Sequence, residues 1–160
     1  MPPPASLRPV VPEDREFLFQ VYASTRTEEL AVVPWTPEQK EAFLRMQFEA
    51  QDRYYRQQFP DASFQVVLVD GRPAGRLYLA RATDEIRIID IALLPADRGR
   101  GVGTGLLRDV LAEGASAGKP VRIHVERFNP AIRLYERLGF VMAEDKGVYL
   151  LMEWSARRAA

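Results

Sequence analysis

Four glycines and two arginines gather in one short stretch, where residues 98–105 read R-G-R-G-V-G-T-G. An apolar run precedes the stretch at 86–92, and apolar residues at helical spacing follow it. Glycine lets the backbone approach a ligand closely, and the first turn of a helix offers unpaired N–H groups to an anion. The stretch is therefore typical of a phosphate site, to which Arg98 and Arg100 would add positive charge.

Two common nucleotide loops do not fit this stretch. The dinucleotide fingerprint G-x-G-x-x-G would need its third glycine at Leu106 or at Thr104, depending on the frame. The triphosphate loop G-x-x-x-x-G-K-[ST] needs a lysine, and the stretch has none. The spacing that does fit is Arg98-x-x-Gly101-x-Gly103.

That spacing resembles the pyrophosphate-binding motif, R/Q-x-x-G-x-G/A, of the GNAT superfamily of acetyl-CoA-dependent N-acetyltransferases. A second segment agrees with it, because residues 129–140 read N-P-A-I-R-L-Y-E-R-L-G-F and resemble the family's second cofactor motif, N-x-x-x-x-L-Y-E-x-x-G-F. The resemblance implies acetyl-CoA as co-substrate, no metal, and an amine on a small molecule or a peptide as acceptor.

The resemblance also implies which residues hold the cofactor. Leu93 and Leu94 would pair backbone groups with the pantetheine arm like an extra strand, one N–H polarising the acetyl carbonyl. Asn129 would lie near that arm, although it also fits a plain N-cap followed by proline. The full set is Leu93, Leu94, Arg98, Gly99, Arg100, Gly101, Val102, Gly103, Thr104 and Asn129.

Tyr135 is the catalytic acid that the resemblance implies, protonating the CoA thiolate as the intermediate collapses. A phenol with an ordinary pKa near about 10 is protonated at neutral pH and can donate to a thiolate. The alternative interpretation is a half-buried aromatic residue of the core.

The general base has two candidates, Asp90 and His124. Regular alternation puts Asp90 on one face with Ile86 and Ile88, and a carboxylate in apolar surroundings can act as a base. His124 lies on a predicted strand with Glu126 on the same face, and an imidazole titrates near neutrality. Both residues could instead be structural, and an acceptor that arrives partly neutral would need no base.

The acceptor pocket is expected at an apolar loop and the long helix after it. Thr36 as N-cap, Pro37 at N1 and Gln39 as a capping box begin a helix that runs to about residue 59. Trp35 and Tyr55 are the predicted acceptor-binding residues. A stripe on the helix is predicted to pack against the core, formed by Phe43, Met46, Ala50, Tyr54 and Gln57.

The elements predict an α/β (α+β) fold, a mixed, mostly antiparallel central sheet with helices on both faces, which is also the GNAT architecture. Asp70-Gly71 is a strong hairpin signal. Strands are predicted at 7–11, 63–70, 73–82, 85–94, 121–126, 140–143 and 148–154, and helices at 12–25, 36–59, from the glycine loop to about 117, and 131–138, with a loop at 27–35.

The length predicts one domain, and the resemblance implies a single N-acetyltransferase domain over 5–155, with a disordered lead-in at 1–4 and a tail at 156–160. Basic and acidic residues number 22 each, which argues against a nucleic-acid partner. The absence of cysteine excludes a thiol nucleophile, and a single histidine disfavours a metal site. With no apolar run long enough for a membrane and no secretory signal, a cytoplasmic location is expected.

The function predicted is direct transfer of an acetyl group from acetyl-CoA to a primary amine. The chain has no cysteine and no G-x-S-x-G elbow, so a ternary complex is expected and no acyl-enzyme. Another acyl-CoA donor, or a catalytically silent CoA-binding module, are the alternatives. The identity of the amine stays open, and the final hairpin could pair two copies into a homodimer.

Overall fold

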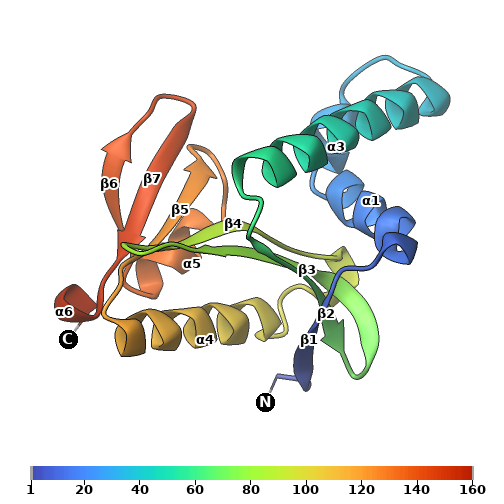
Figure 1. Ribbon diagram of the computed structural model, residues 1–160. Helices are drawn as coiled ribbons and strands as arrows, with labels where there is room; N and C mark the ends of the chain where they lie inside the picture. The colour runs from blue at the N-terminus through green and yellow to red at the C-terminus, as the bar shows by residue number, and fades with distance from the viewer. Residues whose placement is uncertain (1, 160) are drawn as a thin grey trace.

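The computed structural model describes residues 2–159. Seven strands of this chain form one sheet in the order β1-β2-β3-β4-β5-β7-β6 (Figure 1). The strands are β1 (Ala5–Pro9), β2 (Ser63–Val69), β3 (Arg72–Arg81), β4 (Ile86–Leu93), β5 (Val121–Glu126), β6 (Val141–Asp145) and β7 (Tyr149–Trp154). The helices are α1 (Arg15–Ser24), α2 (Thr27–Ala31), α3 (Pro37–Gln58), α4 (Val102–Ala117), α5 (Ile132–Arg137) and α6 (Ala156–Ala159), with short 3-10 turns at Pro12–Asp14 and Pro95–Asp97.

The sheet separates two groups of helices, with α1 and α3 on one face and α4 on the other (Figure 1). Every strand pair is antiparallel except β4 and β5. The main core lies between the sheet and α4, and a smaller cluster joins α1 to α3 around Phe19 and Phe48. The predicted fold, a mixed and mostly antiparallel sheet with helices on both faces, is confirmed.

Local chemistry explains the elements that the sequence predicted well. Asp70 and Gly71 both have positive φ, 52° and 79°, which the tight turn between β2 and β3 requires. The capping box of α3 forms as predicted: the Gln39 N–H donates to Thr36 Oγ1 at 3.1 Å, and the Thr36 N–H donates to Gln39 Oε1 at 2.9 Å. Both signals depend only on neighbouring residues.

Several expectations differ from the structure. The loop expected at 27–35 contains the helix α2, and the first strand ends at Pro9, two residues before the predicted end. The predicted stripe of α3 is wrong: Met46 and Tyr54 are 59% and 56% exposed, because α3 docks through Phe48 on the opposite flank. Of the expected lead-in, Pro4 accepts a hydrogen bond from the Asp70 N–H, and Met1 lies outside the described residues.

The sheet opens in its middle, between β4 and β5. Their parallel pairing joins only Ile86–Ile88 to Val121–Ile123, although both strands continue beyond these residues. Past this short ladder the two strands diverge (Figure 1). The backbone of the second half of β4 therefore has a hydrogen-bonded neighbour, β3, on one side alone.

Candidate active site

The site begins where β4 loses one of its two neighbours. The Leu94 N–H donates to the carbonyl oxygen of Ala74 at 2.8 Å, so this end of β4 still bonds to the β3 side. In an antiparallel ladder, alternate residues point their backbone groups to opposite sides. The N–H groups of Ile91 and Leu93 therefore point away from β3, toward the side from which β5 has diverged.

Leu94 does not offer the free backbone groups that the sequence reasoning gave it. Its N–H is taken by Ala74, and its carbonyl oxygen accepts the Asp97 N–H at 2.9 Å. Its side chain instead lines a cavity beneath the helices. Ile91 is the second free backbone donor instead. The sequence could have identified it, because residues two apart on a strand point their N–H groups to the same side.

Asp90 lies on the face of β4 opposite to the one predicted. The register between β3 and β4 shifts by one residue at Ile89, which is a β-bulge. Ile88 before the bulge and Ile91 after it both pack into the core against α4. The prediction that Asp90 shares a face with Ile86 and Ile88 is wrong, because the extra residue inverts the alternation and turns Asp90 toward α3.

On that face Asp90 is held by two side chains, Arg76 and Tyr55. Arg76 donates from Nε to Oδ1 at 3.2 Å and from Nη2 to Oδ2 at 2.8 Å, and the Tyr55 hydroxyl donates to Oδ2 at 2.8 Å. The Arg76 side chain is only 3% exposed, and its Nη2 also donates to Gln51 Oε1 at 2.8 Å. The carboxylate is thus fixed in orientation, with Oδ1 left the less engaged of its two oxygens.

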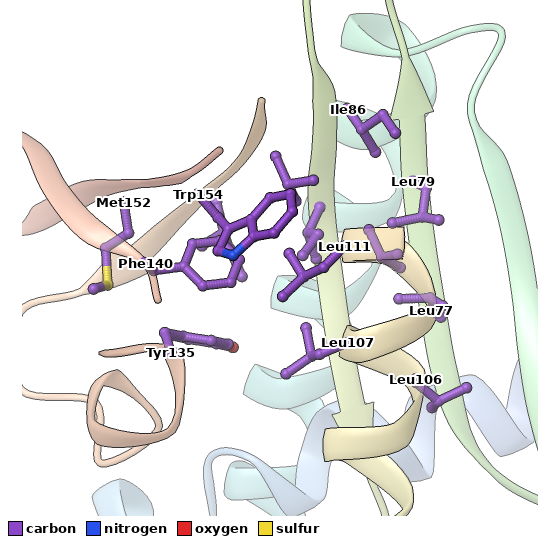
Figure 2. Packing of buried hydrophobic residues seen from close by; sticks show 14 of the residues in the cluster. Leu77, Leu79, Ile86, Leu106, Leu107, Leu111, Tyr135, Phe140, Met152 and Trp154 are labelled. Carbon is purple, nitrogen blue, oxygen red and sulfur yellow. The ribbon is translucent and has the colours of Figure 1, made fainter. Parts of the chain in front are cut away.

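Tyr135 approaches the same opening from the other side of the sheet. It belongs to the main core, where its ring meets Phe140 edge-on with the centroids 5.6 Å apart. Figure 2 shows it reaching from α5 toward Leu107 on α4. Burial and the negative charge of Asp90 raise the pKa of the Tyr135 phenol to about 12, so the phenol is protonated at neutral pH.

The two predicted acceptor-binding residues do not lie together. Tyr55 is beside Asp90, and burial together with the Asp90 charge raises the pKa of its hydroxyl. Trp35 lies just before the N-terminus of α3, whereas Tyr55 lies near the C-terminus. The Trp35 ring packs edge-on against Phe43, and the residue is 42% exposed. The helix rises about 1.5 Å per residue, so Pro37 and Tyr55 are about 27 Å apart along it. A small acceptor cannot touch both residues.

His124 lies on β5, on the α3 side, and is bound to Arg87. Arg87 Nη1 lies 2.8 Å from His124 Nδ1, and because a guanidinium only donates, Nδ1 accepts and the ring proton is on Nε2. Nε2 is buried and has no hydrogen-bond partner among residues 2–159. Burial, and then the positive charge of Arg87, lower the pKa of this imidazole.

The glycine loop leads into an uncapped helix. Gly101, at the N-cap of α4, has φ 86° and no side chain to cap the first turn, so the N–H groups of Val102, Gly103 and Thr104 are left for another partner. The Gly105 N–H already donates to the Gly101 carbonyl oxygen at 3.0 Å. The Val102 side chain is buried in the core, so this residue can offer only its backbone.

Arg98 connects the loop to two other parts of the site. Its Nε donates to the Leu93 carbonyl oxygen at 2.9 Å, and its Nη2 donates to Ser24 Oγ at 3.3 Å. Arg100 is exposed and lies 3.9 Å from buried Asp97, whose carboxylate is held by Arg72. Two guanidinium groups therefore flank the first turn of α4.

Asn129 begins the turn before α5. Its Oδ1 accepts the Ala131 N–H at 2.8 Å, which matches the capping interpretation of this residue. This bond uses the side-chain oxygen.

The model of the acetyltransferase (GNAT) family matches residues 25–140, which include the whole of β4, the glycine loop and α5. The chain belongs to the GNAT acetyltransferase family. A comparison with curated protein sequences gave no match.

Solved structures share this GNAT fold at low sequence identity. The PaiA N-acetyltransferase from Thermoplasma acidophilum, in complex with coenzyme A, has a TM-score of 0.70 at 20% identity, covering 95% of this chain and 99% of its own. A GCN5-related N-acetyltransferase from Rhodopseudomonas palustris has 0.67 at 20%, covering 97% and 98%. A GNAT family acetyltransferase from Elizabethkingia anophelis with acetyl-CoA bound has 0.59 at 15%, covering 94% and 97%.

Two kinds of feature are absent from residues 2–159. No helix there is long and apolar enough to cross a membrane. No group of three or more histidine, cysteine, aspartate or glutamate residues there could hold a metal ion.

The pKa of His124 can be measured directly and tests the buried position of its ring. His124 is the one histidine in the sequence, so the untagged protein should show one imidazole titration by NMR, with a pKa below the ordinary value of about 6.5. Because the unfolded chain then takes up a proton before the folded chain does, the free energy of unfolding should fall as the pH drops below about 6.5. Urea denaturation above and below that pH measures this, and His124→Gln should weaken the dependence. A pKa at or above the ordinary value would contradict the burial of Nε2.

Proposed function

We propose that this enzyme transfers an acetyl group from acetyl-CoA directly to the primary amine of a small molecule or peptide. The observation that carries the proposal is the opening between β4 and β5. Free backbone donors line one side of it, Tyr135 lies on the α4 side, and Asp90 lies on the α3 side. The coenzyme A and acetyl-CoA in the related structures support the choice of donor.

The phosphate end of acetyl-CoA fits the start of α4. The unpaired N–H groups of residues 102–104 and the positive end of the helix dipole favour an anion there. Arg98 and Arg100 add charge, and Gly99 and Gly101 adopt the positive φ that exposes the loop backbone. The pantetheine arm then runs along β4 and completes its hydrogen bonding at Leu93, with Asn129 across the opening.

The transfer step needs a nucleophile, a proton donor and a site for the oxyanion. The amine nitrogen attacks the thioester carbon, and the oxyanion that forms accepts a hydrogen bond from one free backbone N–H of β4, that of Ile91, while Leu93 pairs with the pantetheine arm. The C–S bond then breaks, and the departing thiolate takes the proton of Tyr135. The nitrogen loses its proton, and the amide leaves.

Asp90 is the better placed of the two base candidates. It lies in the half of β4 that β5 does not pair, next to Ile91, whose N–H faces the opening. Arg76 and Tyr55 orient it, and Oδ1 keeps room for a further hydrogen bond from the nitrogen, directly or through water. His124 is bound to Arg87, and a lowered pKa makes its imidazole a weak base.

Residues 5–155 are proposed to act as one acetyltransferase domain, because the sheet runs through all of them. Tyr55 is the aromatic residue that would contact the acceptor, through its position beside Asp90. The exposed strand β6, at the end of the sheet, offers a free edge to a second copy of the chain.

Tyr135→Phe tests the acid. The variant keeps the ring contact with Phe140 and loses only the proton, so turnover of an amine panel, followed by CoA release, should fall on the order of a hundredfold. CoA affinity measured by calorimetry should not change. Tyr54→Phe, at an exposed tyrosine, is the matched control. Equal loss of turnover and CoA affinity would remove the acid role from Tyr135.

Gly103→Val tests the phosphate loop. A Cβ at Gly103 would meet its nearest protein atom, Leu93 Cδ1, at 3.8 Å, so the variant should fold. The added side chain would occupy the space beside the first-turn amides, and CoA affinity should drop by more than about tenfold, measured by calorimetry. Gly105→Val, where the amide is already bonded, should bind normally. Unchanged affinity in the Gly103 variant would place the phosphates elsewhere.

The kinetic mechanism follows from direct attack. Because both substrates must be bound together, initial-rate plots against acetyl-CoA at several amine concentrations should give intersecting lines. Parallel lines would indicate an acyl-enzyme, for which the sequence has no cysteine.

A further inference from the structure

A cavity of about 480 Å³ lies beneath α1, α2 and α3, on the Asp90 side of the sheet. Most of its wall is apolar, and Leu30, Leu44 and Leu94 are its largest apolar side chains. The polar part of the wall consists of Gln20 and Ser24 on α1, Thr27 on α2, and Lys40 on α3. None of the residues that line it is acidic, and Lys40 is its one cation.

The cavity adjoins the point of transfer. Leu94 forms part of its wall and follows Leu93, whose N–H faces the opening between the strands. Ser24, another wall residue, is joined through Arg98 to the Leu93 carbonyl oxygen. The wall of the cavity is thus connected to Leu93 through one peptide bond and through the side chain of Arg98.

Lys40 carries an uncompensated charge into this space. Within residues 2–159 its ammonium takes part in no ion pair, whereas Arg45 on the same helix pairs with Glu16, and Arg26 pairs with Glu29. At the other end of the face, Asp90 is a fixed carboxylate, and the alternation after the bulge puts Leu94 on the same face as Asp90. Asp90 is neutralised by its ion pair with Arg76, whereas the positive charge of Lys40 in the cavity wall has no such partner within residues 2–159.

We infer that the acceptor is an amine with an apolar body and a carboxylate at its far end, which Lys40 binds in the cavity. This rests on the proposed acetyl transfer and adds the class of substrate. The cation orients the molecule, because the carboxylate is drawn toward Lys40 and leaves the amine at the other end. The apolar body replaces water against the leucines between them.

Three amines of equal length test the inference: octylamines that carry a carboxylate, a primary amide or an ammonium at the far end. In the wild-type enzyme, kcat/KM should be at least about tenfold higher for the carboxylate than for the amide, and lowest for the ammonium. Lys40→Gln should bring the carboxylate down to the level of the amide. Lys40→Glu should make the ammonium compound the best of the three. Arg53→Gln, at an exposed cation of the same helix outside the cavity, should leave the order unchanged.

The outcomes separate this inference from the proposed function. Transfer to all three amines at similar rates, or an order that survives Lys40→Glu, would overturn the substrate class while leaving acetyl transfer intact. A Lys40 variant that lost CoA affinity, measured by calorimetry without acceptor, and kept its preference would assign the cation to the cofactor and overturn the inference. If no amine of a wider panel led to release of CoA, that result would instead contradict the proposed function.

Discussion

The site depends on the early end of one strand pairing. A parallel ladder of three residue pairs joins the two parts of the sheet, and beyond it the backbone of β4 is bonded on one side only. Unpaired backbone groups in the interior of a protein are unfavourable unless a partner satisfies them. Here they are arranged in a row at strand spacing, so an extended chain-like molecule with its own amide groups satisfies them as a neighbouring strand would. The loop and α4 then follow directly from the end of the same strand.

A buried ion pair supports this opening from the α3 side. Arg76 on β3, Asp90 on β4 and Tyr55 on α3 come from three elements, and their hydrogen bonds fix how the long helix lies over the sheet. Burying two charges is costly, and such a pair is often no more stabilising than apolar residues of similar size. Its value here is orientation, because a carboxylate held by two partners keeps one direction. The bulge at Ile89 is what turns that carboxylate to this side.

The sequence predicted features that depend on neighbouring residues and missed those that depend on distant ones. The hairpin at Asp70, the capping box at Thr36 and the helix after the glycine loop each follow from local chemistry, and the structure has them. The facing of Asp90 required knowledge of a bulge, which leaves no periodic signal. The partners of Leu94 and the buried flank of α3 are likewise decided by tertiary contacts. Both cofactor motifs could be read in advance because their residues are close together in the chain.

The contacts of Arg98 bear on how the cofactor and the acceptor affect each other's binding. Its guanidinium joins the end of β4 to Ser24 at the cavity wall, and Arg98 is also one of the two arginines of the proposed phosphate loop. A phosphate that drew Arg98 away would release Ser24 and change the cavity. Thermodynamic reciprocity then requires an acceptor in the cavity to change the affinity for the phosphate by the same factor. One side chain would thus couple the binding of the cofactor to the binding of the acceptor before any bond is formed.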